Sequence, residues 1–178
     1  EWLWAEMIET AGDIFPVAYP EGPVGVGTLN DYAFTAEAFL ALASRVKLFA
    51  QGSAERWVNR AKVIVDRAIE KFLDSEKPGF FLTARDQDDL IVRKKDWHDN
   101  AIPSANAGML HALSSLAAIF GEERYREIYQ EIVDLYPALI SNVSSAASHG
   151  MAAIVRDLTG IAVVRANGVE HLYPDLIE

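Results

Sequence analysis

Apolar side chains recur every three or four residues along most of the chain, a spacing that predicts helices. In residues 53–73 they form one stripe, made of Trp57, Ala61, Ile64, Val65, Ala68, Ile69, Phe72 and Leu73. Charged residues fill the other side of this stretch. We therefore expect an amphipathic helix that begins after Ser53, a favourable N-cap, and ends before Lys77. Residues 125–136 repeat the pattern up to a kink or stop at Pro137.

The helix expected before each amphipathic helix is apolar on nearly every side. Residues 31–50 carry a single charge, Glu37, between Tyr32 and Ser44, and residues 104–120 carry no formal charge. A helix that is apolar all round is expected to be buried all round. The order along the chain is therefore buried, amphipathic, buried, amphipathic. This order indicates an inner layer of helices wrapped by an outer layer.

The connections between helices orient the two layers. Inner helices pass to outer helices through short links that contain Gly52 and Gly121, each placed to end its helix. Outer helices pass to inner helices through long segments, residues 16–27 and 78–103. The second segment has apolar runs on both sides of an acidic turn within residues 80–92, which predicts a small β-hairpin. The long loops gather where the inner helices begin, at the positive end of the helix dipoles.

The last part of the chain predicts one more helix and a short strand. We expect the helix at residues 146–158, ended by Gly160, and the strand at residues 161–165. The whole pattern predicts a mainly α protein, with residues 1–178 forming a single domain of helical hairpins and one small β-hairpin between an outer and an inner helix.

Composition and charge narrow the possible partners. The chain has 178 residues, of which 51% are hydrophobic and 24% are charged, as in an ordinary soluble domain. The formal net charge of −10 argues against nucleic acid and anionic membranes, because both need a basic face. The absence of cysteine excludes disulfides, thiol catalysis and thiolate metal sites. The uncharged residues 101–121 are too polar for lipid, and we expect a cytoplasmic protein without membrane contact.

Candidate functional residues lie in the run KKDWHDNAIPSANAGML, residues 94–110. Ser104 follows Pro103 at the expected N-cap of an inner helix, and Asn106 could cap the helix or face a pocket. Asp99 lies in the loop at the dipole-positive end, where an acid is stabilised with or without a catalytic role. His98 beside it has a side chain suited to acid–base chemistry. Asp99 and His98 are therefore candidate catalytic residues, and Ser104 and Asn106 candidate substrate-binding residues.

Further candidates complete this site. Asp31 begins the first inner helix at the same end as Asp99, so it is the third catalytic candidate. Tyr32, Trp97 and Asn100 are further candidates for substrate binding, because they lie close to the same loops. His111, on a buried helix, is expected to be a hydrogen-bonded core residue. The four histidines show no metal-binding spacing, and we expect neither a metal nor another cofactor.

Three segments of the chain resemble a known family. They are LNDYAFTAEAFLAL, PGFFLTARDQDDLIVRKKDWHDNAIPSANAGML and GEERYREIYQEIVDLYPAL. They are similar, in order and over roughly residues 2–176, to the C-terminal region of the YyaL-type proteins, which are spermatogenesis-associated proteins with a thioredoxin-like domain. The run DNAIPSAN, residues 99–106, is the most specific piece. The family usually has D-G-A-x-P-S-G-N there, so Asn100 and Ala105 depart from its pattern.

The resemblance implies part of an (α/α)6 toroid, related to six-hairpin glycosidases and to N-acylglucosamine 2-epimerase. It also implies that this chain is a C-terminal fragment, without the thioredoxin-like domain and about half of the hairpins. Inner helices that normally meet the missing hairpins would then expose apolar surface. We therefore expect self-association, or packing against the missing part of the full-length chain.

Two classes of function remain open. In the first, the loop end binds or processes a carbohydrate. A glycosidase needs two carboxyls about 5 to 9.5 Å apart, which Asp31 and Asp99 could supply from neighbouring helices. A sugar 2-epimerase would need a base beside C2, for which His98 with His149 is the candidate pair. In the second class the helices are a non-catalytic scaffold for the thioredoxin-like domain. A catalytic role requires Asp31, His98 and Asp99 to face one cavity.

Overall fold

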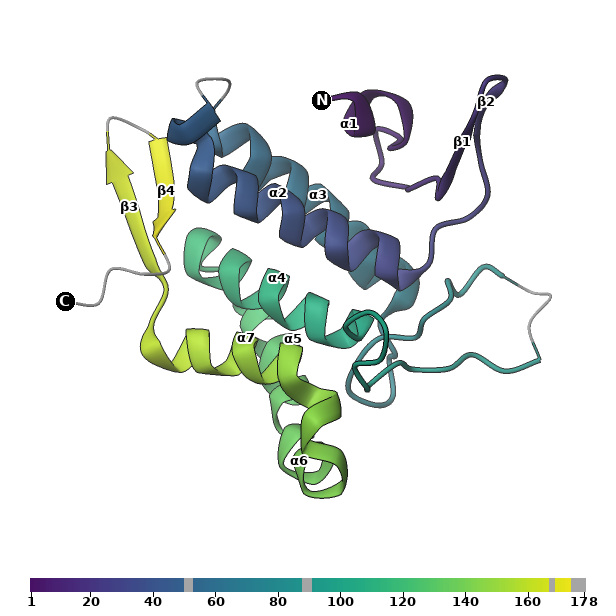
Figure 1. The fold of residues 1–178 in the computed structure, drawn as a ribbon, viewed down its shortest axis with the longest axis vertical. Helices are drawn as coiled ribbons and strands as arrows, with labels where there is room; N and C mark the ends of the chain where they lie inside the picture. The colour runs from purple at the N-terminus through teal and green to yellow at the C-terminus, as the bar shows by residue number, and fades with distance from the viewer. Residues whose placement is uncertain (50–52, 88–90, 167–168, 174–178) are drawn as a thin grey trace.

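The computed structural model describes residues 1–49, 53–87, 91–166 and 169–173, with side chains for residues 1–45, 53–87 and 91–161. The chain is mainly helical (Figure 1). The helices are α1 (Trp2–Glu6), α2 (Leu29–Phe49), α3 (Ala54–Phe72), α4 (Ala105–Phe120), α5 (Glu123–Val133), α6 (Tyr136–Val143), the 3-10 helix η1 (Ser144–Ala147) and α7 (Ser148–Thr159). The strands are β1 (Val17–Tyr19), β2 (Gly22–Val24), β3 (Ala162–Ala166) and β4 (Val169–Tyr173).

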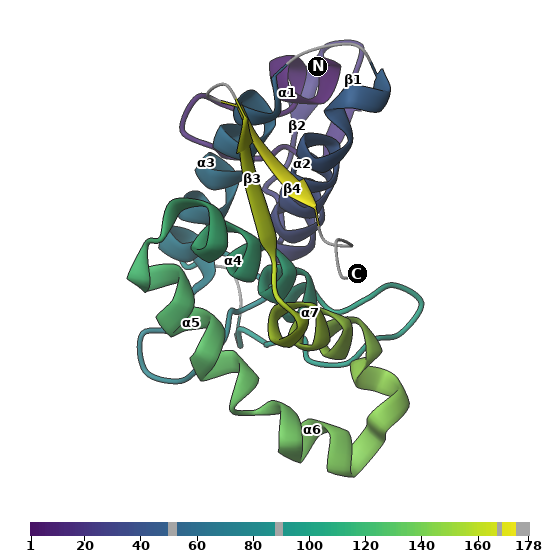
Figure 2. The same cartoon turned by 90° about the vertical axis from the view of Figure 1, so that its left-hand side faces the viewer.

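Three helices form an inner layer and run in the same direction. In Figure 1, α2, α4 and α7 all run from right to left, and Figure 2 shows them stacked one below the other. The central helix α4 packs against both α2 and α7, while α3 packs on α2 and α5 packs on α4. The predicted alternation of inner and outer helices is confirmed for α2 to α5. The long connections that precede α2 and α4 lie at the same end of the layer because these helices are parallel.

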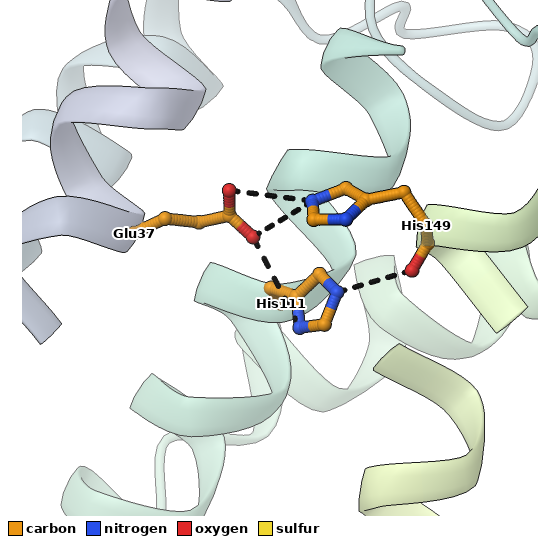
Figure 3. Close-up of side chains that lie close together, drawn as sticks. All are labelled: Glu37, His111 and His149. Carbon is orange, nitrogen blue, oxygen red and sulfur yellow. Dashed lines mark hydrogen bonds and ion pairs between the residues drawn. The ribbon is translucent and has the colours of Figure 1, made fainter. Parts of the chain in front are cut away.

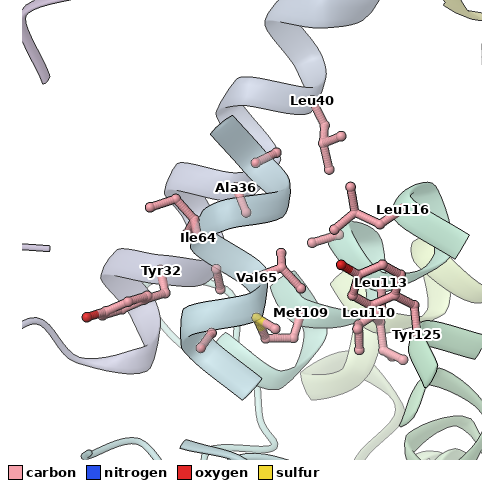
Figure 4. Close-up of a cluster of buried hydrophobic side chains, with 14 of the residues drawn as sticks. Tyr32, Ala36, Leu40, Ile64, Val65, Met109, Leu110, Leu113, Leu116 and Tyr125 are labelled. Atoms are coloured by element: carbon pink, nitrogen blue, oxygen red, sulfur yellow. The ribbon is translucent and has the colours of Figure 1, made fainter. Parts of the chain in front are cut away.

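The hydrophobic core fills the space between the two layers. Figure 4 shows buried side chains of α2, α3, α4 and α5 meeting there, among them Tyr32, Ile64 and Met109. Helix α4 is buried along its whole length except at His111, Ala118 and Phe120, which are partly exposed. This confirms that the uncharged helix lies inside the protein.

Helix α2 is less enclosed than its composition predicts. One side packs in the core, but Phe34 and Thr35 are half-buried, and Ala38 and Ala41 are exposed. The expectation that an apolar helix is buried all round is therefore wrong for α2 within the described residues. No element of the described chain covers this side, so an apolar strip reaches the surface.

The helix ends follow the sequence in most places. Gly121 adopts a left-handed conformation with φ of 67° and ends α4, as predicted. Gly52 lies outside the described residues. Helix α3 begins after Ser53, although the Ser53 side chain forms no capping hydrogen bond. Pro137 lies in the first turn of α6 and so begins a helix rather than stopping one, since a first-turn proline lacks only a donor that would be unpaired anyway.

The β-hairpin predicted within residues 80–92 is wrong for its described part. Residues 88–90 lie outside the described structure, and no strand forms at residues 80–87 or 91–92. The backbone N–H groups of Phe81 and Arg85 instead donate to the carbonyls of Phe72 and Lys71, at 2.9 and 3.0 Å. These carbonyls belong to the last turn of α3, where helix carbonyls have no intrahelical partner. The N–H of Leu82 does donate to the Lys94 carbonyl at 2.7 Å, so the two halves of the segment meet there without forming strands in the described residues.

Two antiparallel hairpins form elsewhere. β1 pairs with β2 in the segment before α2, where no strand was predicted. β3 confirms the predicted strand near residues 161–165 and pairs with β4. The structure thus consists of helical hairpins with small two-stranded sheets, and membership of an (α/α)6 toroid stays a prediction.

Candidate functional site

Ser104 and Asp99 organise the loop in front of α4. The Ser104 hydroxyl accepts a hydrogen bond from the N–H of Ala107 at 3.1 Å, which confirms its predicted capping role. The Asp99 carboxylate accepts hydrogen bonds from Ser104 N (2.9 Å), His149 N (2.8 Å) and the Ser148 hydroxyl (3.0 Å). Partial burial raises the pKa of Asp99, but the N–H groups of His149 and Ser104 outweigh it and hold the pKa below its usual value. Asp99 therefore ties this loop to the start of α7.

Asp31 and Tyr32 form hydrogen bonds with residues of the segment that precedes α2. The Asp31 carboxylate accepts hydrogen bonds from the backbone N (2.7 Å) and hydroxyl (2.9 Å) of Thr28, so it caps its own helix. Tyr32 is buried with its ring edge against Phe72, and its hydroxyl accepts from Ile14 N at 3.3 Å. Both residues hold the segment before α2 in place.

The remaining predicted residues lie on or near the surface of the same loop, except Asn106. The buried Asn106 amide accepts from Phe80 N (2.8 Å) and donates to Phe80 O (3.0 Å) and to Asp96 O (2.9 Å). These hydrogen bonds hold the long connection of residues 78–103 against α4. Trp97 packs over Gly79, where a Cβ would overlap the indole ring.

His98 and Asn100 are exposed, and the Asn100 amide lies 3.4 Å from the His98 carbonyl. The structure thus gives Asp31 and Asp99 separate capping partners and leaves the His98 ring at the surface. Asp31, His98 and Asp99 do not line the cavity beside the inner helices, so the convergence that their catalytic role requires is not seen there.

That cavity, of about 420 Å³, lies along the three inner helices, away from the predicted loop end. Its lining residues are Glu37, Leu40, Ala41, Ser44 and Arg45 of α2, His111 and Ser115 of α4, Arg156 of α7, and Ile161. The α2 residues follow one another at spacings of one, three and four, which places them on one side of that helix. The polar members come from three helices that are distant in sequence.

Glu37 and His111, which line this cavity, meet His149 beside it (Figure 3). The Nε2 atom of His149 lies 3.1 and 3.3 Å from the two carboxylate oxygens of Glu37. His111 Nδ1 lies 4.0 Å from Glu37 Oε1, and its Nε2 lies 3.0 Å from the His149 carbonyl oxygen. A carbonyl oxygen only accepts, so Nε2 of His111 carries a hydrogen. Neutral His111 therefore presents an unprotonated Nδ1 toward the carboxylate.

The two histidines differ in their affinity for a proton. Burial lowers the pKa of His111 to about 4, and the positive charges of Arg156 and His149 add to this effect. The hydrogen bond to Glu37 raises the pKa of His149, against its partial burial. The cluster thus pairs an imidazole that is neutral near neutral pH with one that holds its proton more strongly than a free histidine does. Titratable groups whose environments push their pKa values apart are typical of acid–base sites.

Neighbouring residues fix this cluster in place. The Arg156 guanidinium reaches from α7 to α4 and donates through Nη2 to the His111 carbonyl (2.8 Å) and to the hydroxyls of Ser114 (3.0 Å) and Ser115 (2.7 Å). Gly150, next to His149, allows close packing, since a Cβ there would overlap the Tyr136 hydroxyl. The cluster is thus held by contacts between rigid helices.

The same three residues could hold a metal ion. Glu37, His111 and His149 each offer one ligand atom, and these atoms lie within 4.8 Å of one another. Imidazole and carboxylate are common zinc ligands. The sequence spacing of the histidines indicated no such site, because the three residues come from α2, α4 and α7.

A comparison with protein-family models and with curated proteins finds no match. The resemblance to YyaL-type proteins therefore stays a prediction. The helical run Glu123–Thr159, taken as one helix, contains a window long and apolar enough to cross a membrane by length and composition. This is weak evidence, because the run is divided into α5, α6, η1 and α7. The cytoplasmic location also stays a prediction.

Proposed function

We propose that the chain processes a carbohydrate by moving a proton at a carbon next to a carbonyl group. The observation that carries this proposal is the Glu37–His111–His149 cluster beside the cavity, in which burial lowers the pKa of one imidazole and a carboxylate raises the pKa of the other. An acid and a base held side by side are what enolisation of a sugar requires.

The cavity supports isomerisation better than the two other reactions considered. A glycosidase needs two carboxyls, and Glu37 is the single acidic residue among the described residues that line the cavity. An epimerase that uses two bases must approach C2 from opposite faces. The rings of His111 and His149 lie 4.4 Å apart, centroid to centroid, which leaves no room for a substrate between them. Both imidazoles therefore act from the same side of a ligand, as an aldose–ketose isomerisation allows.

The residues take the following roles in this reaction. Nδ1 of His111 removes the proton from C2 of the open-chain aldose, and the C–H electron pair forms a C1–C2 double bond. The carbonyl oxygen takes a proton from cationic His149, whose charge Glu37 stabilises. The resulting enediol then loses its O2 proton to His149, and His111 returns its proton to C1. Atoms and charges balance, and no redox partner is needed.

Deuterium exchange tests this function directly. The chain is incubated in D2O with a panel of aldoses and ketoses, and NMR follows deuterium at C2 and the formation of the isomer. His111→Gln keeps a donor near the His149 carbonyl but removes the base, so we expect exchange to fall by at least about a hundredfold. His98→Gln, at the surface, should leave the rate unchanged. Exchange that persists in His111→Gln, or that is absent for every sugar tested, would overturn the proposal.

The pH profile provides a second criterion. The reaction needs neutral His111 and cationic His149, so its rate should fall as pH drops through about 4. It should fall again as pH rises through the raised pKa of His149, above the usual histidine value. A rate that rises steadily through this upper range would contradict these roles.

A non-catalytic scaffold is the second candidate. It is favoured by the strip of α2 that carries the half-buried Phe34 and the exposed Ala38, outside the lining of the cavity. A scaffold would associate with a partner through this strip and show no exchange with any sugar.

A further inference from the structure

Positively charged side chains line the cavity that Glu37 and His111 also line. Arg45 of α2 and Arg156 of α7 both line the cavity, together with the Ser115 hydroxyl. Glu37 is the one acid among the described lining residues, and it is already bonded to His149. The cavity is thus locally positive in a chain whose formal net charge is −10. A local field of this sign attracts anions that the rest of the surface repels.

The two arginines have no carboxylate partner within the described chain. Arg45 forms no ion pair or hydrogen bond there, and Arg156 bonds to hydroxyl and carbonyl oxygens alone. The Nε of Arg156 is buried and has no hydrogen-bond partner in the described residues. A buried guanidinium without a counter-charge is costly, and a ligand that supplies the anion would offset this cost. The guanidinium is also held by α4 before any ligand arrives.

Two chemically different sets of groups therefore lie at the cavity. On α2, Glu37 and Arg45 are eight residues apart, about 12 Å along the helix axis. On α7, His149 and Arg156 are seven residues apart, about 10 Å along the axis. Since α2 and α7 run in the same direction (Figure 1), the backbone of both arginines lies toward the same end, although the Arg156 guanidinium reaches back to the His111 carbonyl and the Ser115 hydroxyl of α4.

We propose that this cavity binds an open-chain sugar derivative with an anionic group, a carboxylate or a phosphate, held by Arg45, Arg156 and Ser115. The inference rests on the proposed function for the chemistry of the reactive end, and it adds the substrate class. The carbonyl group of the sugar lies at His111 and His149. Its anionic group receives charge-assisted hydrogen bonds from the two guanidinium groups.

Calorimetric titration of the full chain with matched sugars tests the anion site. Glucose, glucuronate and glucose 6-phosphate share a carbon skeleton and differ in charge, so the two acids distinguish a carboxylate from a phosphate. We expect at least one of them to bind about tenfold or more tightly than glucose. This advantage should shrink as salt is added, and inorganic phosphate should compete with the charged sugar. Equal affinity for all three sugars would overturn the proposal.

Variants show whether the named arginines are responsible. Arg45→Gln should reduce the affinity for the charged sugar about tenfold more than the affinity for glucose. Arg45 has no structural partner in the described chain, so this variant should fold normally. Arg156→Gln should act in the same way if it folds. The control is Arg56→Gln. Arg56 lies on the outer helix α3 and forms an ion pair with Glu1. Unchanged affinity in Arg45→Gln would refute the site as assigned.

The two proposals fail in different ways. Tight, arginine-dependent binding of the charged sugar without deuterium exchange supports the anion site and contradicts the isomerase. Exchange with neutral aldoses at the same rate as with charged sugars, and with no effect of Arg45→Gln, supports the isomerase and contradicts the anion site.

Discussion

Replacing Asp99 with alanine should destabilise the protein by about 2 to 3 kcal/mol. The Asp99 carboxylate accepts three hydrogen bonds, from Ser104 N, His149 N and the Ser148 hydroxyl. Hydrogen bonds to a charged group contribute about 1.5 to 3 kcal/mol each when fully buried. Asp99 is half-buried, so water can replace part of what the variant loses. The carboxylate also stabilises the N-terminal end of α7, by up to about 1 kcal/mol.

The assay is urea unfolding followed by circular dichroism, with two companion variants. Asp99→Asn retains one acceptor oxygen and no charge, so it should lose about half as much as Asp99→Ala. Asp96→Asn is the control, because the Asp96 carboxylate forms no hydrogen bond within the described chain, and it should change stability by less than about 0.5 kcal/mol. If Asp99→Ala unfolds at the same urea concentration as the unmodified chain, then Asp99 does not stabilise the contact between the loop and α7.

The dependence on pH gives this prediction a second measurement. Hydrogen bonds lower the pKa of Asp99 in the folded state, so its contribution is fully present above the unfolded value of 3.8. The contribution is lost as pH falls through the lowered folded pKa. The difference in stability between the unmodified chain and Asp99→Ala should therefore shrink at the lowest pH at which both remain folded.

The helices could be predicted from the sequence because their signals are local. The apolar stripe of α3, the uncharged α4 and the serine and glycine at its two ends each act within a few residues. The hairpin prediction failed in the described residues, where the segment bonds to the end of α3 through Phe81 and to residue 94 through Leu82 without forming strands. The exposed strip on α2 was also missed. Composition shows that a helix is apolar enough to be buried, but it does not show whether other elements cover each of its sides.

The candidate site was sought in the loops because polar residues concentrate there. Most of those side chains instead complete the hydrogen bonds of helix ends and loop backbone, as Asp99 and Asn106 do. The residues of the Glu37–His111–His149 cluster lie within helices and meet across a sequence separation as large as 112 residues, between Glu37 and His149. One signal was present: Glu37 is the single charge between Tyr32 and Ser44 of an inner helix. A lone ionisable residue at such a position indicates a partner or a function.

Three further predictions follow from single features. Ser104→Ala removes the cap of α4 and should lower stability by about 1 kcal/mol in urea unfolding. Ala38→Glu places a charge on the exposed strip of α2 and should reduce any self-association in sedimentation velocity; an unmodified chain that stays monomeric at high concentration contradicts the strip as an interface. Acidification should destabilise the fold through His111, whose pKa is about 4 in the folded state and 6.5 in the unfolded state. The unfolded chain binds the proton first, so stability falls as pH drops from about 6.5 to 4, by about 2 to 3 kcal/mol. The charged groups around this ring are Glu37, His149 and Arg156. The raised pKa of His149 has the opposite effect, so its contribution is present below the unfolded value and lost as pH rises. Comparison of the unmodified chain with His111→Gln at each pH isolates the His111 contribution, because both proteins contain His149. The variant should lose less stability between pH 6.5 and 4, and equal losses in the two proteins would show that His111 is not held neutral by its surroundings.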